Sequence, residues 1–217
     1  MQKKVYAFDF DGTLTTRDTL LEFIRFACGT RAFLAGFALH LPLLVLMKLH
    51  LYSNHKMKER IFRHFFGGMA ESRFNALCTD FAFYGRRLLR PGAMEVLECA
   101  LATGGRVAVV SASIDNWVAP FFAHLVSSDG KCRVAVAGTR IEVRDGTVTG
   151  RFSTPNCYGK EKVKRLLELF PDRRNYHLTA FGDSRGDREM FIEADTACKP
   201  SRRKGSAYPF QIVYDKK

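Results

Sequence analysis

The chain has 217 residues, and its 34 lysines and arginines against 22 aspartates and glutamates give a net charge of +12. Hydrophobic residues make up 47% and charged residues 26%, which excludes a disordered chain and permits a core of ordinary size. The basic surplus favours anionic partners such as phosphorylated metabolites, lipid headgroups or nucleic acid, although a solvated basic surface has the same composition.

The first apolar segment, residues 5–10, has the pattern of a buried strand; it contains Asp9 near its end and is followed directly by Asp11. Ligands of open α/β sheets bind beyond the carboxyl ends of strands. Residues at i and i+2 leave a strand on the same side, so one carboxylate can attack phosphorus while the other transfers a proton. Gly12 permits close backbone approach, and Thr13 supports the loop. A polar turn is the alternative for this pattern alone.

Residues 17–88 contain no strand pattern and predict an all-helical insertion, or cap, after the first strand. Residues 1–16 and 89–217 would then form one α/β core. Asp18 is placed to cap the helix that starts at Thr19. The expected helices span residues 19–28, 31–50, 54–66 and 71–87.

The insertion contains an uncharged apolar segment between Arg31 and Lys48. Its sixteen residues would extend about 24 Å as a helix, whereas a membrane span needs roughly 20 apolar residues. The basic flanks favour a helix on an anionic lipid surface, with peripheral membrane contact through residues 32–52. A buried cap helix and a dimer contact are the alternatives.

After the insertion, residues 106–110 form a second apolar strand pattern that runs into Ser111. Helical patterns on both sides of this strand predict a mostly parallel sheet flanked by helices. The Ser111 hydroxyl can hold a phosphate oxygen at the strand end. The alternative is a helix-capping serine, a role that Ser113 or Asp115 could also fill.

The remaining segments predict a hairpin and a second acidic loop. Residues 141–152 alternate about an Asp-Gly turn. Lys162, with Lys160 as its rival, opens a helix and could screen the gathered carboxylates. Asp183 and Asp187 follow a third strand pattern, and their carboxylates suit Mg²⁺ unless they only cap a helix. A basic tail at residues 201–205 precedes an expected edge strand near residues 211–214.

Together these motifs resemble the haloacid dehalogenase-like superfamily of hydrolases. The resemblance rests on DxDGT, a serine after an apolar strand, a lysine that opens a helix, and GDSxxD, in that order. It implies a Rossmann-like core with a type-one cap. The segments 9–18, 110–113 and 156–159 look like the phosphoserine phosphatase-like subgroup, and within it like phosphatidylglycerophosphatase C-like proteins.

The resemblance implies a phosphatase mechanism with assigned roles. Asp9 would form an aspartyl-phosphate, and Asp11 would act as general acid and then general base. Ser111 and Lys162 would bind the transferring phosphoryl group. The pattern of a dehalogenase needs no second aspartate and no metal, so Asp11 and an acidic metal loop favour a phosphatase.

The resemblance also implies a Mg²⁺ cofactor. Asp9, the backbone carbonyl of Asp11, and Asp183 would hold the ion. Asp187 would orient Lys162 or a water bound to the metal.

The substrate is left open between a lipid phosphate such as phosphatidylglycerophosphate and a small metabolite such as phosphoserine. Asp18 lies near the acidic position that selects the substrate in phosphoserine phosphatases. A non-enzymatic membrane-associated or regulatory protein is the alternative, and no nucleic-acid partner is expected. Possible cap partners for a carboxylate are Arg25, Arg31, Arg60 and Arg63.

The six cysteines are scattered without a CxxC pair and predict free thiols in a reducing compartment. The first apolar run is broken at once by Asp9 and Asp11, so no signal peptide is expected. We therefore expect a cytoplasmic protein, with peripheral contact at the inner membrane face as a further expectation.

Overall fold

A computed structural model describes residues 3–49, 51–201 and 209–216. Its main sheet has six strands in the order β3-β2-β1-β6-β7-β8, all parallel except the edge strand β8. The expected mostly parallel sheet is confirmed, as is the edge strand near the end of the chain. The basic tail falls mainly on residues 202–205, outside the described part. The strands span Lys3–Phe8 (β1), Arg106–Ile114 (β2), Val134–Thr139 (β3), Tyr176–Phe181 (β6), Thr196–Pro200 (β7) and Phe210–Asp215 (β8).

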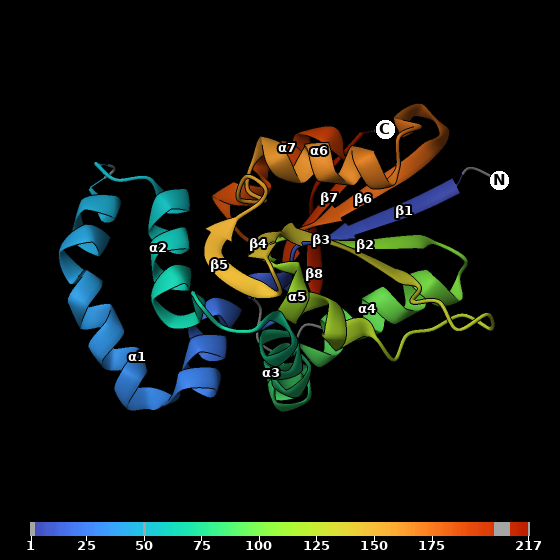
Figure 1. The fold of residues 1–217 in the computed structure, drawn as a ribbon. Helices are drawn as coiled ribbons and strands as arrows, with labels where there is room; N and C mark the ends of the chain where they lie inside the picture. Colours follow the sequence, from blue (N-terminus) through green and yellow to red (C-terminus); the bar gives the residue numbers. More distant parts are fainter. Residues whose placement is uncertain (1–2, 50, 202–208, 217) are drawn as a thin grey trace.

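Helices cover both faces of this sheet (Figure 1). Alternate residues of a strand point to opposite faces, and β2 shows the result. Val107 and Val109 join the apolar cluster that contains Leu97 of α4 (Pro91–Ala102). Ala108 and Val110 join the cluster formed with α6 (Lys160–Leu169) and α7 (Arg188–Glu193) on the other face. The α/β architecture with a helix-covered sheet is therefore confirmed.

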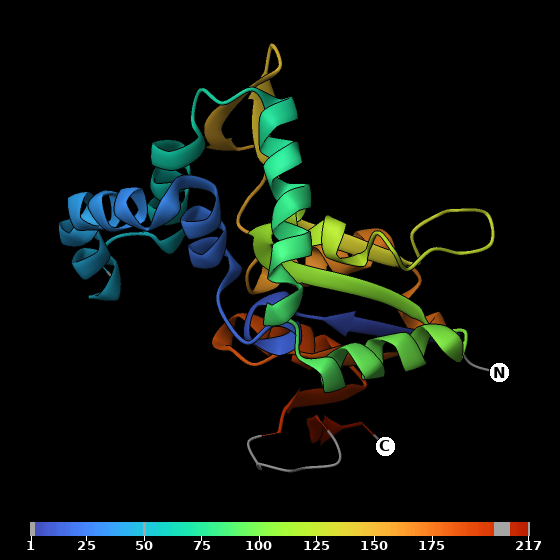
Figure 2. The same cartoon turned by 90° about the horizontal axis from the view of Figure 1, so that it is seen from below.

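The helical region after β1 contains α1 (Thr19–Lys48), α2 (Asn54–Phe66) and α3 (Glu71–Tyr84), and it projects from one end of the sheet (Figure 2). The two helices expected at 19–28 and 31–50 form the two arms of α1. They are separated by a kink at Gly29, whose φ of 81° lies in the left-handed region that favours glycine. Short helical turns complete the described elements at Phe10–Leu14, Gly85–Leu88, Ala119–Phe122, Arg173–Asn175 and Arg185–Asp187.

Aromatic side chains join this helical region to the core. Phe23 of α1 is fully buried and stacks on Trp117 of α5 (Asp115–Val118), with 4.9 Å between ring centroids. Large buried rings remove much apolar surface from water and add favourable edge contacts. The first arm of α1 is therefore fixed to the core through an aromatic cluster. The other rings that contact Phe23 belong to Phe66, Phe74 and Phe81.

The expected hairpin is present as β4 (Ile141–Arg144) and β5 (Thr147–Phe152). In space it joins the helical insertion and not the main sheet. Gly68 N–H donates to the Val148 carbonyl at 2.8 Å, and Phe152 N–H donates to the Glu59 carboxylate of α2 at 2.9 Å. The hairpin therefore packs against the proposed cap at 17–88, although it comes from a later part of the chain.

The second arm of α1 is apolar on both its faces. Phe33, Gly36 and His40 are buried, while Leu39 and Leu41 are 66% and 58% exposed. By length and composition α1 could cross a membrane, and 17% of its most apolar window is buried. Core helices and signal sequences meet the same criterion, so this is weak evidence for a span. What the structure does show is a largely exposed apolar helix surface.

Candidate active site

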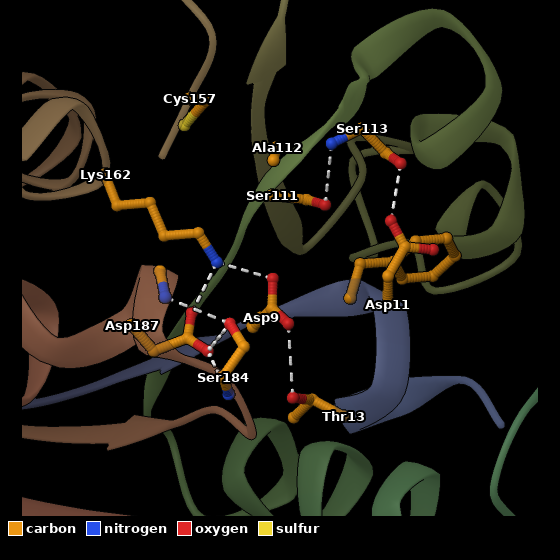
Figure 3. Close-up of polar contacts among 12 residues, drawn as sticks. Asp9, Asp11, Thr13, Ser111, Ala112, Ser113, Cys157, Lys162, Ser184 and Asp187 are labelled. Carbon is orange, nitrogen blue, oxygen red and sulfur yellow. Dashed lines mark hydrogen bonds and ion pairs between the residues drawn. The ribbon is translucent and has the colours of Figure 1, made fainter. Parts of the chain in front are cut away.

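Asp9 lies directly after β1, at the carboxyl end of the sheet, and is almost completely buried. Its backbone N–H donates to the carbonyl of Phe181, the last residue of the neighbouring β6, at 2.8 Å. Lys162 Nζ lies 2.5 Å from Asp9 Oδ1, and the Thr13 hydroxyl donates to Oδ2 at 3.3 Å (Figure 3). Both oxygens of the predicted nucleophile are therefore held in place.

Lys162 is 2% exposed and contacts two carboxylates, because its Nζ also donates to Asp187 Oδ1 at 2.6 Å. Lys160, two residues earlier, is exposed at the start of α6. Burial alone would lower the pKa of Lys162, but Asp9 and Asp187 raise it above its usual range. Lys162 is therefore held in its charged form, and it is the lysine that lies within the cluster.

The pKa of Asp9 is also raised, but here burial causes the rise and the neighbouring lysine opposes it. Burial raises the pKa of Asp9 to about 7, against the lowering effect of Lys162, and the negative charge of Asp187 adds to the rise. One lysine therefore faces more than one carboxylate. An additional cation would lower the cost of keeping Asp9 ionised.

Asp187 is fully buried, and hydrogen bonds occupy both its oxygens. Oδ1 accepts from Lys162, while Oδ2 accepts from the backbone N–H groups of Asp183 and Ser184 and from the Ser184 hydroxyl, at 2.9 to 3.1 Å. This arrangement orients both Lys162 and the loop after β6. Asp187 was expected to lie beside Lys162, and the structure places it in direct contact with the Lys162 ammonium group.

Asp183 and Gly12 form the exposed side of the cluster. One carboxylate oxygen each from Asp9, Asp183 and Asp187 lie within 4.8 Å of one another. A Cβ at Gly12 would lie 2.4 Å from Asp183 Oδ2, and the φ of Gly12 is 81°. Among the described residues, no hydrogen bond or ion pair reaches the Asp183 carboxylate. Oxygen ligands of this kind, open to water, fit Mg²⁺.

Asp11 faces away from this cluster in the structure. Its Oδ1 accepts from the backbone N–H and hydroxyl of Thr19 at 2.7 and 2.6 Å, and its Oδ2 accepts from the Ser113 hydroxyl at 2.5 Å. Figure 3 shows this separation from Asp187. Asp11 lines the same pocket as Asp9, but its side chain is held by the start of α1.

Ser111 is buried on the pocket wall, and its hydroxyl accepts from the Ser113 N–H at 3.0 Å. The helix α5 begins at Asp115 and has no side-chain capping hydrogen bond. The alternative of a helix cap from Ser111, Ser113 or Asp115 is therefore wrong. Ser113 instead orients Asp11, a contact that the sequence pattern did not indicate.

Asp18 caps α1, as expected, by accepting from the N–H groups of Leu20 and Leu21 at 2.9 and 3.3 Å. It also lines the pocket. Burial raises its pKa, and the charge of Asp11 adds to the rise. Asp18 was expected to lie near the substrate, and its position on the pocket wall agrees with that expectation. One of its carboxylate oxygens is already used by the helix cap.

Lys58 of α2 is a pocket residue that sequence reasoning missed. Its Nζ donates to the Ala112 carbonyl at 2.6 Å, between Ser111 and Ser113 near the end of β2. Burial lowers the pKa of Lys58, against the raising effects of Asp11 and Asp18. The only sequence signal was a lysine beside the buried Met57 on an amphipathic helix. None of Arg25, Arg31, Arg60 and Arg63 lines this pocket.

The pocket above Asp9 has a volume of about 510 Å³ and two chemical regions. Its floor is polar and contains Asp9, Ser111, Lys162 and Asp183. Its upper wall comes from α1 and α2 and is mainly apolar. The apolar lining residues are Leu20, Leu21, Phe37, Leu44, Met47, Met57 and Ile61.

Comparison with known proteins places this geometry in a family. The family model of haloacid dehalogenase-like hydrolases matches residues 6–191. The chain belongs to this family. Protein CicA of Caulobacter vibrioides strain NA1000 / CB15N is 36% identical over 193 residues, which cover 87% of this chain and 82% of the relative. The haloacid dehalogenase-like resemblance seen in the motifs is confirmed.

Solved structures share the haloacid dehalogenase-like fold. A protein of unknown function from Bordetella pertussis Tohama I has a TM-score of 0.74 and 21% identity. The match covers 91% of this chain and 89% of the Bordetella chain. A substrate-bound phosphoserine phosphatase has a TM-score of 0.62 and 20% identity, covering 92% and 86%. At these identities the similarity concerns the fold, and the expected likeness to phosphoserine phosphatases is confirmed at that level.

Proposed function

We propose that this chain is a Mg²⁺-dependent phosphomonoester hydrolase that works through an aspartyl-phosphate on Asp9. The observation that carries the proposal is the buried Lys162, which bridges Asp9 and Asp187 beside the open carboxylate of Asp183. A cation placed against a nucleophilic carboxylate is suited to bind a phosphoryl group as it transfers. Membership of a hydrolase family supports the same reaction class.

In the first step, an oxygen of Asp9 attacks phosphorus and the bond from phosphorus to the leaving oxygen breaks. Asp11 donates a proton to that oxygen, so the product leaves as an alcohol. In the second step, the Asp11 carboxylate takes a proton from a water that attacks phosphorus. The bond from phosphorus to Asp9 then breaks, which releases phosphate and restores the Asp9 carboxylate.

Lys162 and Ser111 would stabilise the phosphoryl oxygens in both steps. Lys162 offers a charged donor, and the Ser111 hydroxyl is already fixed on the pocket wall. Asp9, the Asp11 backbone carbonyl and Asp183 would hold Mg²⁺, with Asp187 keeping Lys162 in position. When bound, the ion supplies positive charge that neutralises the phosphoryl oxygens.

Borohydride trapping during turnover tests the covalent step. Reduction of an acyl phosphate at Asp9 gives homoserine, which peptide mass spectrometry detects. We expect homoserine at position 9 with Mg²⁺ and a phosphomonoester, and none in Asp9→Asn. The control Asp80→Asn changes an exposed aspartate of α3 and should leave trapping intact. Absence of phosphate release from every phosphoester tested would favour the non-enzymatic alternative.

The substrate that the pocket fits best is an amphiphilic phosphate. Its polar floor would receive the phosphoryl group, while the apolar wall from Phe37, Leu44 and Met47 would contact a hydrocarbon portion. Arg17, Asp18 and Lys58 are the charged groups of residues 17–88 that line the pocket. They would contact polar groups between the phosphate and the apolar portion, so a lipid phosphate such as phosphatidylglycerophosphate suits the pocket better than phosphoserine.

A direct comparison of substrates tests this assignment. Phosphate release from phosphatidylglycerophosphate in mixed micelles is measured beside release from phosphoserine and sugar phosphates. We expect at least a tenfold higher kcat/KM for the lipid, since about 1.4 kcal/mol of apolar contact corresponds to that factor. Phe37→Ser should remove the preference. Equal turnover of soluble phosphates would contradict the lipid assignment and leave the phosphatase proposal intact.

The exposed face of α1 supports peripheral contact with the inner face of a membrane. Leu34, Leu39 and Leu41 are exposed on a segment without charge between Arg31 and Lys48. An apolar helix face with basic flanks binds anionic lipid surfaces. Flotation with vesicles of phosphatidylglycerol and phosphatidylcholine should recover the wild-type protein but not Leu39→Ser/Leu41→Ser. The control Phe83→Ser alters an exposed apolar residue of α3 and should float as wild type.

A further inference from the structure

A second pocket of about 510 Å³ lies between α1 and α2. It shares no lining residue with the pocket above Asp9. The proposed hydrolysis makes no use of it. Its lining residues are His40, Tyr52, Lys56, Glu59, Arg60, Arg63 and His64. We refer to these seven residues as the basic cap pocket.

Positive side chains dominate the basic cap pocket. Lys56, Arg60 and Arg63 recur at intervals of four and three along α2, which places them on one face of the helix. Within residues 3–49, 51–201 and 209–216, none of these three cations forms an ion pair with a carboxylate. The acidic member, Glu59, uses its carboxylate to accept the N–H of Phe152. The pocket therefore holds three cations against one carboxylate, and that carboxylate forms no ion pair with any of the three.

His40 adds an unpartnered polar atom to this pocket. Its side chain is 8% exposed, in the middle of the uncharged segment of α1. No atom of the described residues forms a hydrogen bond with His40 Nε2. The ring of His64 lies edge-on to it, with 5.1 Å between centroids. A buried imidazole nitrogen without a partner is unfavourable, and a ligand oxygen in the pocket would remove that cost.

The surroundings of the pocket indicate the kind of anion. Leu39 and Leu41, the chain neighbours of His40, are exposed on the outer face of α1. Cationic donors therefore lie beside an apolar surface, as in sites where a headgroup phosphate is held while the protein contacts acyl chains. Arginine is suited to phosphate because its planar group donates two parallel hydrogen bonds.

We propose that the basic cap pocket binds the headgroup phosphate of an anionic phospholipid, with the outer face of α1 against the acyl chains of the same bilayer. The inference rests on the membrane contact put forward under the proposed function, and it assigns that contact a specific polar site. The lipid bound here is an anchor and is distinct from the substrate at Asp9. The mouth of the catalytic pocket would thereby be held near the membrane surface.

The test compares vesicle affinity and soluble turnover in the same variants. Arg60→Gln/Arg63→Gln removes two donors, and at about 1 kcal/mol per cation near the surface we expect roughly 30-fold weaker binding to phosphatidylglycerol vesicles. The control Lys160→Gln/Lys164→Gln removes the same charge from exposed positions of α6. We expect it to weaken binding less than threefold. An equal loss in both variants would show unspecific attraction and overturn the proposal.

A charge-neutral variant separates the site from general electrostatics. His40→Leu removes the unpartnered nitrogen and should weaken binding at least threefold, and wild-type affinity in this variant would count against the site. Phosphate release from a soluble phosphoester should be unchanged in Arg60→Gln/Arg63→Gln, which distinguishes failure at this pocket from failure of the phosphatase proposal. With inorganic phosphate as the probe, a rise in Tm that Arg60→Gln/Arg63→Gln loses, together with wild-type vesicle affinity in that variant, would assign the pocket to free phosphate and refute the lipid assignment.

Discussion

Replacing Lys162 with methionine removes the cation from the centre of the buried cluster. Lys162 is 2% exposed and contacts Asp9 at 2.5 Å and Asp187 at 2.6 Å. Loss of one partner of a buried ion pair leaves uncompensated charge and costs about 3–5 kcal/mol. We therefore expect the free energy of unfolding of the metal-free protein to fall by that amount at pH 8, as measured by urea denaturation.

The loss should depend on pH in a defined direction. The pKa of Asp9 in the folded protein is already raised to about 7, so its protonated form is favoured on folding. Without Lys162 the pKa of Asp9 should rise further. Below pH 6, Asp9 can take a proton and relieve the unpaired charge, so the difference from wild type should shrink as the pH falls and grow as it rises through 7.

Activity gives an independent measure of the same substitution. Removal of one donor that stabilises charge in a transition state lowers kcat by about 10²–10³. Lys160→Met is the matched control, because Lys160 lies two residues away and is exposed. Its stability and kcat should remain close to wild type. Equal behaviour of Lys162→Met and Lys160→Met would refute the assignment of the phosphate-site lysine.

Three further predictions concern the metal, the glycine beside it and the helical region. Because the pKa of Asp9 is about 7, Mg²⁺ binding should release about 0.9 proton at pH 6 and about 0.1 at pH 8; calorimetry in buffers of different ionisation enthalpy measures this, and equal release at both pH values would contradict it. Gly12→Ala should cost about 1–3 kcal/mol in backbone strain and weaken Mg²⁺ binding at least tenfold, since its Cβ meets Asp183. Gly130→Ala has a similar φ and open space around it, so it should show the strain without the loss of metal. Phe23→Ala should lower the free energy of unfolding by about 3–5 kcal/mol in one cooperative transition, whereas Phe83→Ala should change it little; separate transitions would show that the helical region unfolds on its own.

The sequence predicted the floor of the site because parallel strands bring their carboxyl ends to one edge. Asp9 and Asp183 each follow such a strand, so their proximity required only the strand pattern. The motif alone does not distinguish Lys160 from Lys162, but helix periodicity does. Lys162 lies four residues before the buried Leu166, and so on the same face of α6. Lys160 is rotated about 200° from Lys162 and faces solvent.

Contacts between distant segments could not be predicted in the same way. The places of Lys58 and of the hairpin depend on how α2 packs against the core, and no local pattern encodes that packing. No local pattern indicated that Ser113 would bind Asp11 instead of capping a helix. The two expected apolar helices proved to be arms of one kinked α1, because Gly29 redirects the chain without ending the helix.

The hydrogen bonds from Thr19 to Asp11 couple the position of α1 to the position of the Asp11 carboxylate. Thr19 is the first residue of α1, and it donates twice to the oxygen of Asp11 that faces it. A rotation of Asp11 toward Asp9 must break both bonds, and a displacement of α1 must move the carboxylate that accepts them. Under the proposed mechanism, the helix whose residues line the catalytic pocket and the carboxylate that would protonate the leaving oxygen are therefore expected to move together, because Thr19 joins them.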